Sequence, residues 1–89
     1  MESLLIMLKV DLGITTTAYD VRLAQYLRSA QAAMTREGIM VDPSAPEDGQ
    51  ILVMYAAWMW RRRDSMEAMP RMLRYQLNNR LFAQKAGEA

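Results

Sequence analysis

The sequence predicts an all-α fold: a small bundle of about four helices with one long Pro-containing connection. Apolar residues recur with the 3.6-residue period of a helix, and no stretch shows the convincing alternation of a strand. Hydrophobic residues make up 52% of the 89-residue chain, which argues against disorder. A domain of this size has a thin margin of stability, so partners that cover leftover apolar surface are favourable. We expect one domain over 1–85 and a frayed polar tail over 86–89.

The composition argues against several classes of function. Eleven basic and ten acidic residues give a net charge of +1, whereas strong nucleic-acid binders usually carry a large basic excess. The chain has no cysteine and no histidine, which excludes disulfides, thiolate nucleophiles, histidine-based triads and the usual zinc sites. No glycine-rich phosphate loop is present either. We therefore expect no enzymatic activity, no cofactor and no metal.

Membrane insertion is not expected. The longest uninterrupted apolar run, Ile51 to Trp60, has ten residues, and a membrane-spanning helix needs about twenty. The N-terminal stretch has no basic region before its apolar residues and carries Asp11 soon after them, so it makes a poor signal peptide.

Two helices are expected in the first part of the chain. The first covers about 2–12 and stops at Gly13, which suits a left-handed cap. The second follows a cap at Thr16 or Thr17, has Asp20 in its first turn and ends at Gly38. The first helix groups Leu5, Leu8 and Leu12 on one face, with Ile6 and Val10 pointing elsewhere. The second has an apolar stripe of Leu23, Tyr26, Leu27, Ala30, Ala33 and Met34.

The connection over 39–46 contains Pro43 and Pro46, which forbid regular structure around them. Pro46 suits the first position of the third helix, with Glu47 and Asp48 in the first turn. The acidic residues here do not have the spacing of an EF-hand loop, so their charge is interpreted as helix capping.

The third helix is expected over about 46–63. It is apolar on every side between Ile51 and Trp60, and a helix that is apolar all round is buried all round. Because one short chain can hardly cover every side, we expect part of its cover to come from another molecule.

The fourth helix is expected to start at Pro70 and to end near Ala83. It carries two apolar stripes about 180° apart, one suited to the domain's own core and the other to a partner. The first stripe is Leu73, Leu77 and Leu81, and the second is Met72, Tyr75, Phe82 and Ala83.

The arginines at 61–63, directly after Trp58 and Trp60, allow three interpretations. They complement the dipole of the third helix, form ion pairs with another subunit, or bind phosphate. Tryptophans at helical spacing among Met and Ala are typical of a core, and an interface is the alternative, since Trp, Tyr, Met and Arg are enriched at contact surfaces. The nine methionines likewise suit core filling or an adaptable interface.

Four stretches together resemble the small head–tail connector proteins of tailed bacteriophages, also called adaptor or head completion proteins. The resemblance covers nearly the whole chain. It includes an aromatic helix with an Arg-rich end and an entry into the last helix at Met69, Pro70 and Arg71. The stretches are LKVDLGI (8–14), YDVRLAQYLRSAQAAM (19–34), REGI (36–39) and ILVMYAAWMWRRRDSMEAMPRMLRYQLNNRLF (51–82).

The resemblance implies a structural virion protein in the neck of a tailed phage, present in the host cytoplasm during assembly. Such subunits form a homo-oligomeric ring, usually twelve-fold, beneath the portal protein. The ring extends the DNA channel, through which DNA passes without being read, and docks the next neck or tail protein. A ring needs heterologous contacts, in which one face of a subunit meets a different face of its neighbour.

The expected contact residues combine charge-assisted hydrogen bonds with aromatic contacts. Two other functions compete with the connector. One is a helix-turn-helix-type DNA-binding regulator that reads bases through the fourth helix, and the other is a membrane-surface module that uses the Trp–Arg stretch. The expected subunit or partner interface is Trp60, Arg61, Arg62, Arg63, Arg71, Arg74, Tyr75, Asn78, Asn79, Arg80 and Phe82.

Overall fold

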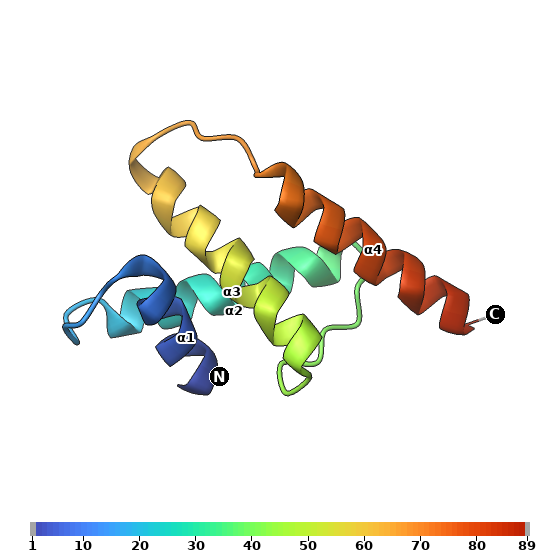
Figure 1. The fold of residues 1–89 in the computed structure, drawn as a ribbon, viewed down its shortest axis with the longest axis horizontal. Helices are drawn as coiled ribbons and strands as arrows, with labels where there is room; N and C mark the ends of the chain where they lie inside the picture. Colours follow the sequence, from blue (N-terminus) through green and yellow to red (C-terminus); the bar gives the residue numbers. More distant parts are fainter. Residues whose placement is uncertain (1, 89) are drawn as a thin grey trace.

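Four α-helices follow one another in the computed structural model, which describes residues 2–88 (Figure 1). No strand occurs among these residues, which confirms the predicted all-α class. The molecule is elongated, with principal extents of 45 × 28 × 18 Å. The elements are α1 (Glu2–Leu12), α2 (Asp20–Arg36), α3 (Pro46–Arg61), a short 3₁₀ turn η1 (Arg62–Asp64) and α4 (Arg71–Glu88).

Helix α3 is the centre of the fold. It packs against α1, α2 and α4, and Figure 1 shows α1 and α4 on opposite sides of it. Eight of the ten residues from Ile51 to Trp60 are buried, and only Met54 and Met59 are half-buried. The expectation that another molecule must complete the cover of α3 is therefore wrong. Three helices of the same chain are enough to surround a hydrophobic segment this short.

Helix α2 buries the predicted stripe, and Tyr26 at its edge is half-buried. The expected threonine cap is wrong, because α2 begins at Asp20 without a side-chain cap. Thr16 instead accepts a hydrogen bond from the backbone N–H of Ala18. Asp20 lies in the first turn as predicted and also forms a 2.8 Å ion pair with Lys9, which joins α1 to the start of α2.

Glycines end the first two helices where the sequence places them. Gly13 (φ 70°) and Gly38 (φ 95°) adopt the left-handed backbone conformation that residues with a Cβ avoid. Helix α1 then buries Leu4 and Leu8 against the core, with Leu5 and Leu12 half-buried beside them. The face opposite is left exposed.

The 39–45 connection is anchored at its start and contains a local hydrogen-bonded turn. Ile39 is buried in the core, and Asp42 accepts hydrogen bonds from both the N–H and the hydroxyl of Ser44. These bonds lower the pKa of the Asp42 carboxyl from its ordinary value of 3.8. Pro46 occupies the start of α3 as predicted, followed by Glu47 and Asp48 in the first turn.

Helix α4 differs from its predicted bounds at both ends. It begins at Arg71, one residue after Pro70, and it runs to Glu88 instead of ending near Ala83. The segment 86–88, expected to be a frayed tail, is thus helical, and Ala89 lies outside the described residues. Gln84 gives a physical reason for the extension. Its side chain accepts a hydrogen bond from the N–H of Met40 (2.7 Å) and donates one to the carbonyl of Gly38 (2.9 Å), which holds the helix beyond Ala83.

Candidate subunit-contact surface

Helix α4 docks on the domain through one face only. Leu73 and Leu77 are fully buried against the core, and Leu81 packs half-buried beside them. This inner face is the first of the two stripes predicted from the sequence. The segment over 65–70, exposed except for the half-buried Met69, joins α4 to η1. The indole N–H of Trp58 fastens it by donating to the carbonyl of Glu67 (3.2 Å).

The opposite face of α4 is apolar and uncovered. Met72 is 60% exposed, Tyr75 62% and Phe82 77%. We call these three residues the α4 outer face. Two of them, Tyr75 and Phe82, are among the predicted contact residues, and the structure places them where a partner could reach both. The predicted contact residues Arg71, Asn78 and Asn79 are also exposed on α4.

Two predicted contact arginines on α4 are turned toward the chain itself. Arg74 forms a two-bond ion pair with Glu37 at the end of α2, with distances of 2.8 and 3.3 Å. The hydrogen bond to Glu37 raises the pKa of Arg74. Arg80 pairs with Asp48 in the first turn of α3, and this bond likewise raises its pKa. Both arginines thus have acidic partners in the same chain, and a contact of Arg74 or Arg80 with another subunit stays a prediction.

The Arg80–Asp48 pair is the centre of a buried polar network. Arg80 donates through Nε to Asp48 Oδ1 (2.6 Å) and through Nη2 to Asp48 Oδ2 (3.2 Å) and to the carbonyl of Met40 (2.8 Å). Asp48 Oδ2 also accepts from the backbone N–H of Asp42 (2.9 Å). The network fixes α4, the 39–45 connection and α3 to one another. It also explains how a carboxylate with only 3% of its side chain exposed remains inside the fold.

The Arg-rich end of α3 folds back over the tryptophans. Trp58 and Trp60 are each 8% exposed, and Trp60 meets the rings of Tyr19 and Tyr26 edge-on at centroid distances of 5.3 and 6.1 Å. Trp60 therefore belongs to the core. Its inclusion among the expected contact residues is corrected, because Tyr19, just before α2, and Tyr26 of α2 already cover it.

The arginines of this end stack on the same two indoles. The guanidinium carbon of Arg62 lies 4.7 Å from the Trp58 ring centroid, and that of Arg63 lies 3.7 Å from the Trp60 ring centroid. Arg63 also donates to the carbonyl of Trp60 (2.6 Å), one of the last carbonyls of α3. Three interpretations of residues 61–63 were open. The observed contacts agree with the first, in which the arginines complement the end of α3. Arg61 is exposed on α3.

A second uncovered apolar face lies on α1. Ile6 is 62% exposed and Val10 74%, and Met7 beside them is half covered. We call these three residues the α1 outer face. The sequence placed Ile6 and Val10 away from the core-facing leucines, but it did not mark them as a contact surface. The sequence signal for this face was a pair of apolar residues one helical turn apart, on a side of the helix away from those leucines.

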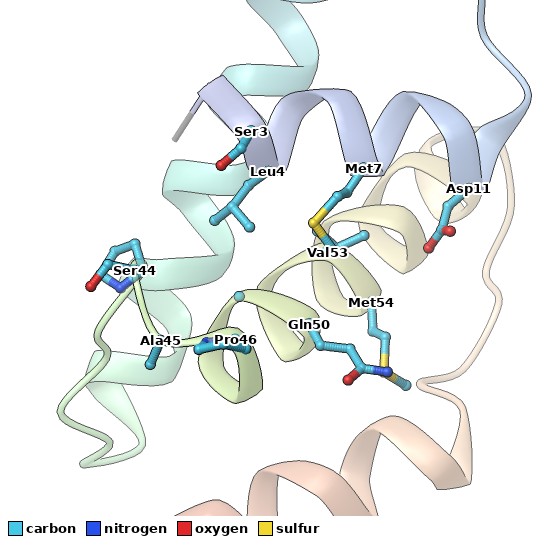
Figure 2. A pocket seen from close by; sticks show the side chains of 12 residues that line it. Ser3, Leu4, Met7, Asp11, Ser44, Ala45, Pro46, Gln50, Val53 and Met54 are labelled. Atoms are coloured by element: carbon cyan, nitrogen blue, oxygen red, sulfur yellow. The ribbon is translucent and has the colours of Figure 1, made fainter.

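The α1 outer face borders a cleft between α1 and the first half of α3. Figure 2 shows Leu4 and Met7 of α1 facing Gln50, Val53 and Met54 of α3 across it, with the 43–46 segment closing one end. The cleft has a volume of about 480 Å³ and a mostly apolar lining. Its two methionines are flexible enough to adapt to a guest side chain.

Within residues 2–88, no helix combines the length and the apolar character needed to cross a membrane. The same residues contain no group of three or more acidic side chains placed to hold a metal ion. Comparisons of the chain with protein-family models, with curated proteins and with solved structures gave no match.

Proposed function

We propose that this protein is a head–tail connector subunit of a tailed bacteriophage. In this role copies of the chain form a ring under the portal, extend the DNA channel and dock the next neck or tail protein. The observation that carries the proposal is the two-faced α4, whose inner leucines hold it to the domain while Met72, Tyr75 and Phe82 face solvent. The phage assignment rests on the sequence resemblance of the stretches 8–14, 19–34, 36–39 and 51–82.

The exposed area supports an assembling protein. A folded monomer of 10.2 kDa exposes about 5300 Å² by the usual scaling with mass. This chain exposes 5912 Å², and ten large hydrophobic side chains among the described residues are exposed. Three of those ten lie on one side of α4, where a single partner would cover them together. Exposed apolar side chains gathered on one face are typical of protein contacts.

A structural role also fits the chemistry of the side chains. Without histidine or cysteine, a catalytic site would depend on carboxylates and arginines. The most buried carboxylate, Asp48, is fully engaged by Arg80 and the N–H of Asp42. We therefore propose a non-enzymatic protein that needs no cofactor.

A helix-turn-helix-type regulator is the main competitor, because Asn78 and Asn79 are exposed on α4 and could meet base edges. Two features weigh against it. Arg80, the third candidate reader, is held by Asp48. In addition, residues 62–70 separate α3 from α4, whereas the helices of that motif are joined by a turn of about 3–4 residues. Sequence-specific binding in a gel shift at moderate salt would favour the regulator.

A membrane-surface module would need aromatic rings at the surface of the Trp–Arg stretch. Both tryptophans are instead covered by their own chain. Flotation with anionic liposomes tests this alternative directly, and we expect the protein to stay in the bottom fraction.

The decisive experiment is native mass spectrometry of the purified protein, alone and mixed with a purified portal ring. We expect a closed ring of defined subunit number, formed alone or on the portal. The double variant Tyr75→Ala with Phe82→Ala should keep its helix content by circular dichroism and lose assembly. Global unfolding of this variant would show that the α4 outer face belongs to the core. Absence of rings under both conditions would overturn the proposed function.

A further inference from the structure

The two uncovered apolar faces carry opposite charge at their edges. On α1, Glu2 lies one turn before Ile6 and Asp11 lies one turn after Met7. On α4, Arg71 lies one turn before Tyr75, and Lys85 follows Phe82 by three residues. None of the four flanking charges, Glu2, Asp11, Arg71 and Lys85, forms an ion pair with another described side chain. Each face thus has an apolar centre between two free charges of one sign.

The same polarity extends over the whole chain. Residues 1–50 hold four basic and seven acidic side chains, and residues 51–89 hold seven basic and three acidic ones. The two parts therefore have net charges of −3 and +4, and −1 and +2 remain outside the Arg74–Glu37 and Arg80–Asp48 pairs that join them. Complementary potentials of this kind steer two copies into a head-to-tail encounter and oppose the pairing of like faces.

We propose that the α4 outer face of one copy packs on the α1 outer face of a second copy, with an aromatic ring of α4 entering the adjoining cleft. The partner is a sister copy, so the inference rests on the proposed function. Met7 and Met54 line the cleft and can adapt to a Phe82 or Tyr75 ring. Arg71 and Lys85 would meet Glu2 and Asp11 at the rim of the contact. The cleft and the two apolar faces would form the centre of the contact.

The positions of the two faces determine the kind of assembly. Because α1 and α4 lie on opposite sides of α3 (Figure 1), one neighbour cannot cover both faces of the same copy. Each copy must therefore bind one neighbour through α4 and another through α1. Such a heterologous contact produces a ring when its rotation closes. A standard contact buries about 800 Å² per partner, which is a small part of the 5912 Å² available.

Two face variants test the contact. The first is Tyr75→Ala with Phe82→Ala, which removes the α4 outer face, and the second is Ile6→Ala with Val10→Ala, which removes the α1 outer face. A matched control, Val21→Ala with Met66→Ala, removes two exposed apolar side chains outside both faces. Circular dichroism checks that all of them fold. Sedimentation velocity and native mass spectrometry, at protein concentrations up to about 1 mM, report association.

We expect wild type and control to form oligomers and each face variant to be monomeric, with association weakened at least about tenfold. An equimolar mixture of the two face variants should form a 1:1 heterodimer that grows no further, because each partner supplies the face that the other lacks. Association of the Ile6→Ala, Val10→Ala variant at the wild-type level would overturn the proposal, since it would mean that α4 pairs with α4. A mixture that stays monomeric, or wild type that is monomeric at the highest concentration, would overturn it as well.

Charge-reversal variants test the charged rim of the contact separately from its apolar centre. Arg71→Glu with Lys85→Glu should weaken binding at least about tenfold, and Glu2→Lys with Asp11→Lys in the partner copy should restore most of it. No restoration would place the α4 face against a different surface. If wild type forms rings on a portal but the equimolar mixture of the two face variants stays monomeric, this contact is overturned and the proposed function stands. Absence of rings under every condition would overturn the proposed function instead.

Discussion

Two stretches of the chain combine aromatic residues with arginines, and the fold uses them in opposite ways. At the end of α3 the rings of Trp58 and Trp60 point inward, and Arg62 and Arg63 lie over them. On α4 the order is reversed: the arginines at 74 and 80 reach inward to carboxylates, and the rings of Tyr75 and Phe82 face solvent. The composition of a stretch thus does not reveal which of its members face the interior.

The difference follows from how many neighbours each helix has. Helix α3 contacts α1, α2 and α4, so its aromatic rings are covered. Trp60 meets the rings of Tyr19 and Tyr26, and Tyr55 meets Trp58. Tyr55 illustrates the effect, because burial raises the pKa of its hydroxyl. Helix α4 rests on the domain along one side and has no covering helix on the other. Its outer rings therefore stay exposed among the described residues, and we propose that a contact between copies covers them.

The largest expected difference in stability is between the variants that remove one aromatic ring from each stretch. Trp60→Ala should lower the free energy of unfolding by about 3–5 kcal/mol, because it leaves a cavity beside Tyr19 and Tyr26. Phe82→Ala should change it by less than about 0.5 kcal/mol, since that ring already faces water. Urea denaturation followed by circular dichroism measures both. Similar losses for the two variants would contradict the contrast between an inward and an outward stretch.

The second prediction compares the two inward ion pairs of α4. Asp48→Ala should cost about 3 kcal/mol, because it leaves the half-buried Arg80 and the N–H of Asp42 without their acceptor. Glu37→Ala should cost no more than about 1 kcal/mol, because Arg74 is 44% exposed and water replaces the lost partner. Thermal or urea unfolding of the two variants gives the comparison. An equal cost would mean that the Arg80 network is not what fixes α4.

The smallest effect concerns the arginines that stack on the tryptophans. Arg63→Gln should cost about 1 kcal/mol, because it removes the stacking on Trp60 and the hydrogen bond to its carbonyl. Arg71→Gln, at an exposed position without an ion pair among the described residues, should be nearly neutral for folding. Unfolding followed by tryptophan fluorescence measures both, and a shifted emission maximum in Arg63→Gln alone would report the uncovered indole. Loss of stability in Arg71→Gln would contradict its assignment to the surface.

Much of the fold was predictable because its signals are local. The apolar stripe of α2 and the inner leucines of α4 follow from the helical period, and Gly13 and Gly38 end helices because only glycine adopts a positive φ freely. The two-sided character of α4 was predictable for the same reason. The cap of α2 was not, because several threonines compete at its start and none of their side chains caps it.

The candidate site was predictable only in part, because its members depend on residues far away in the sequence. Trp60 is not available as a contact residue, because Tyr19 and Tyr26 cover it. Arg80 points inward, because it binds Asp48, 32 positions earlier. The α1 outer face was missed as a contact surface, because a short helix with apolar residues on several sides gives no sign of which side a neighbour will cover.

The sequence by itself determined that the chain is helical, where its helices lie within a few residues, and that α4 has two apolar faces. Spacing and backbone preference are properties of neighbouring residues, so no tertiary information was needed for them. The tertiary structure alone decided which aromatic rings are covered, which arginines are bound by carboxylates of the same chain, and that the two uncovered faces lie on opposite sides of α3. Those outcomes depend on the packing of segments distant in the chain, where the neighbours of a side chain, and not its identity, determine whether it is exposed.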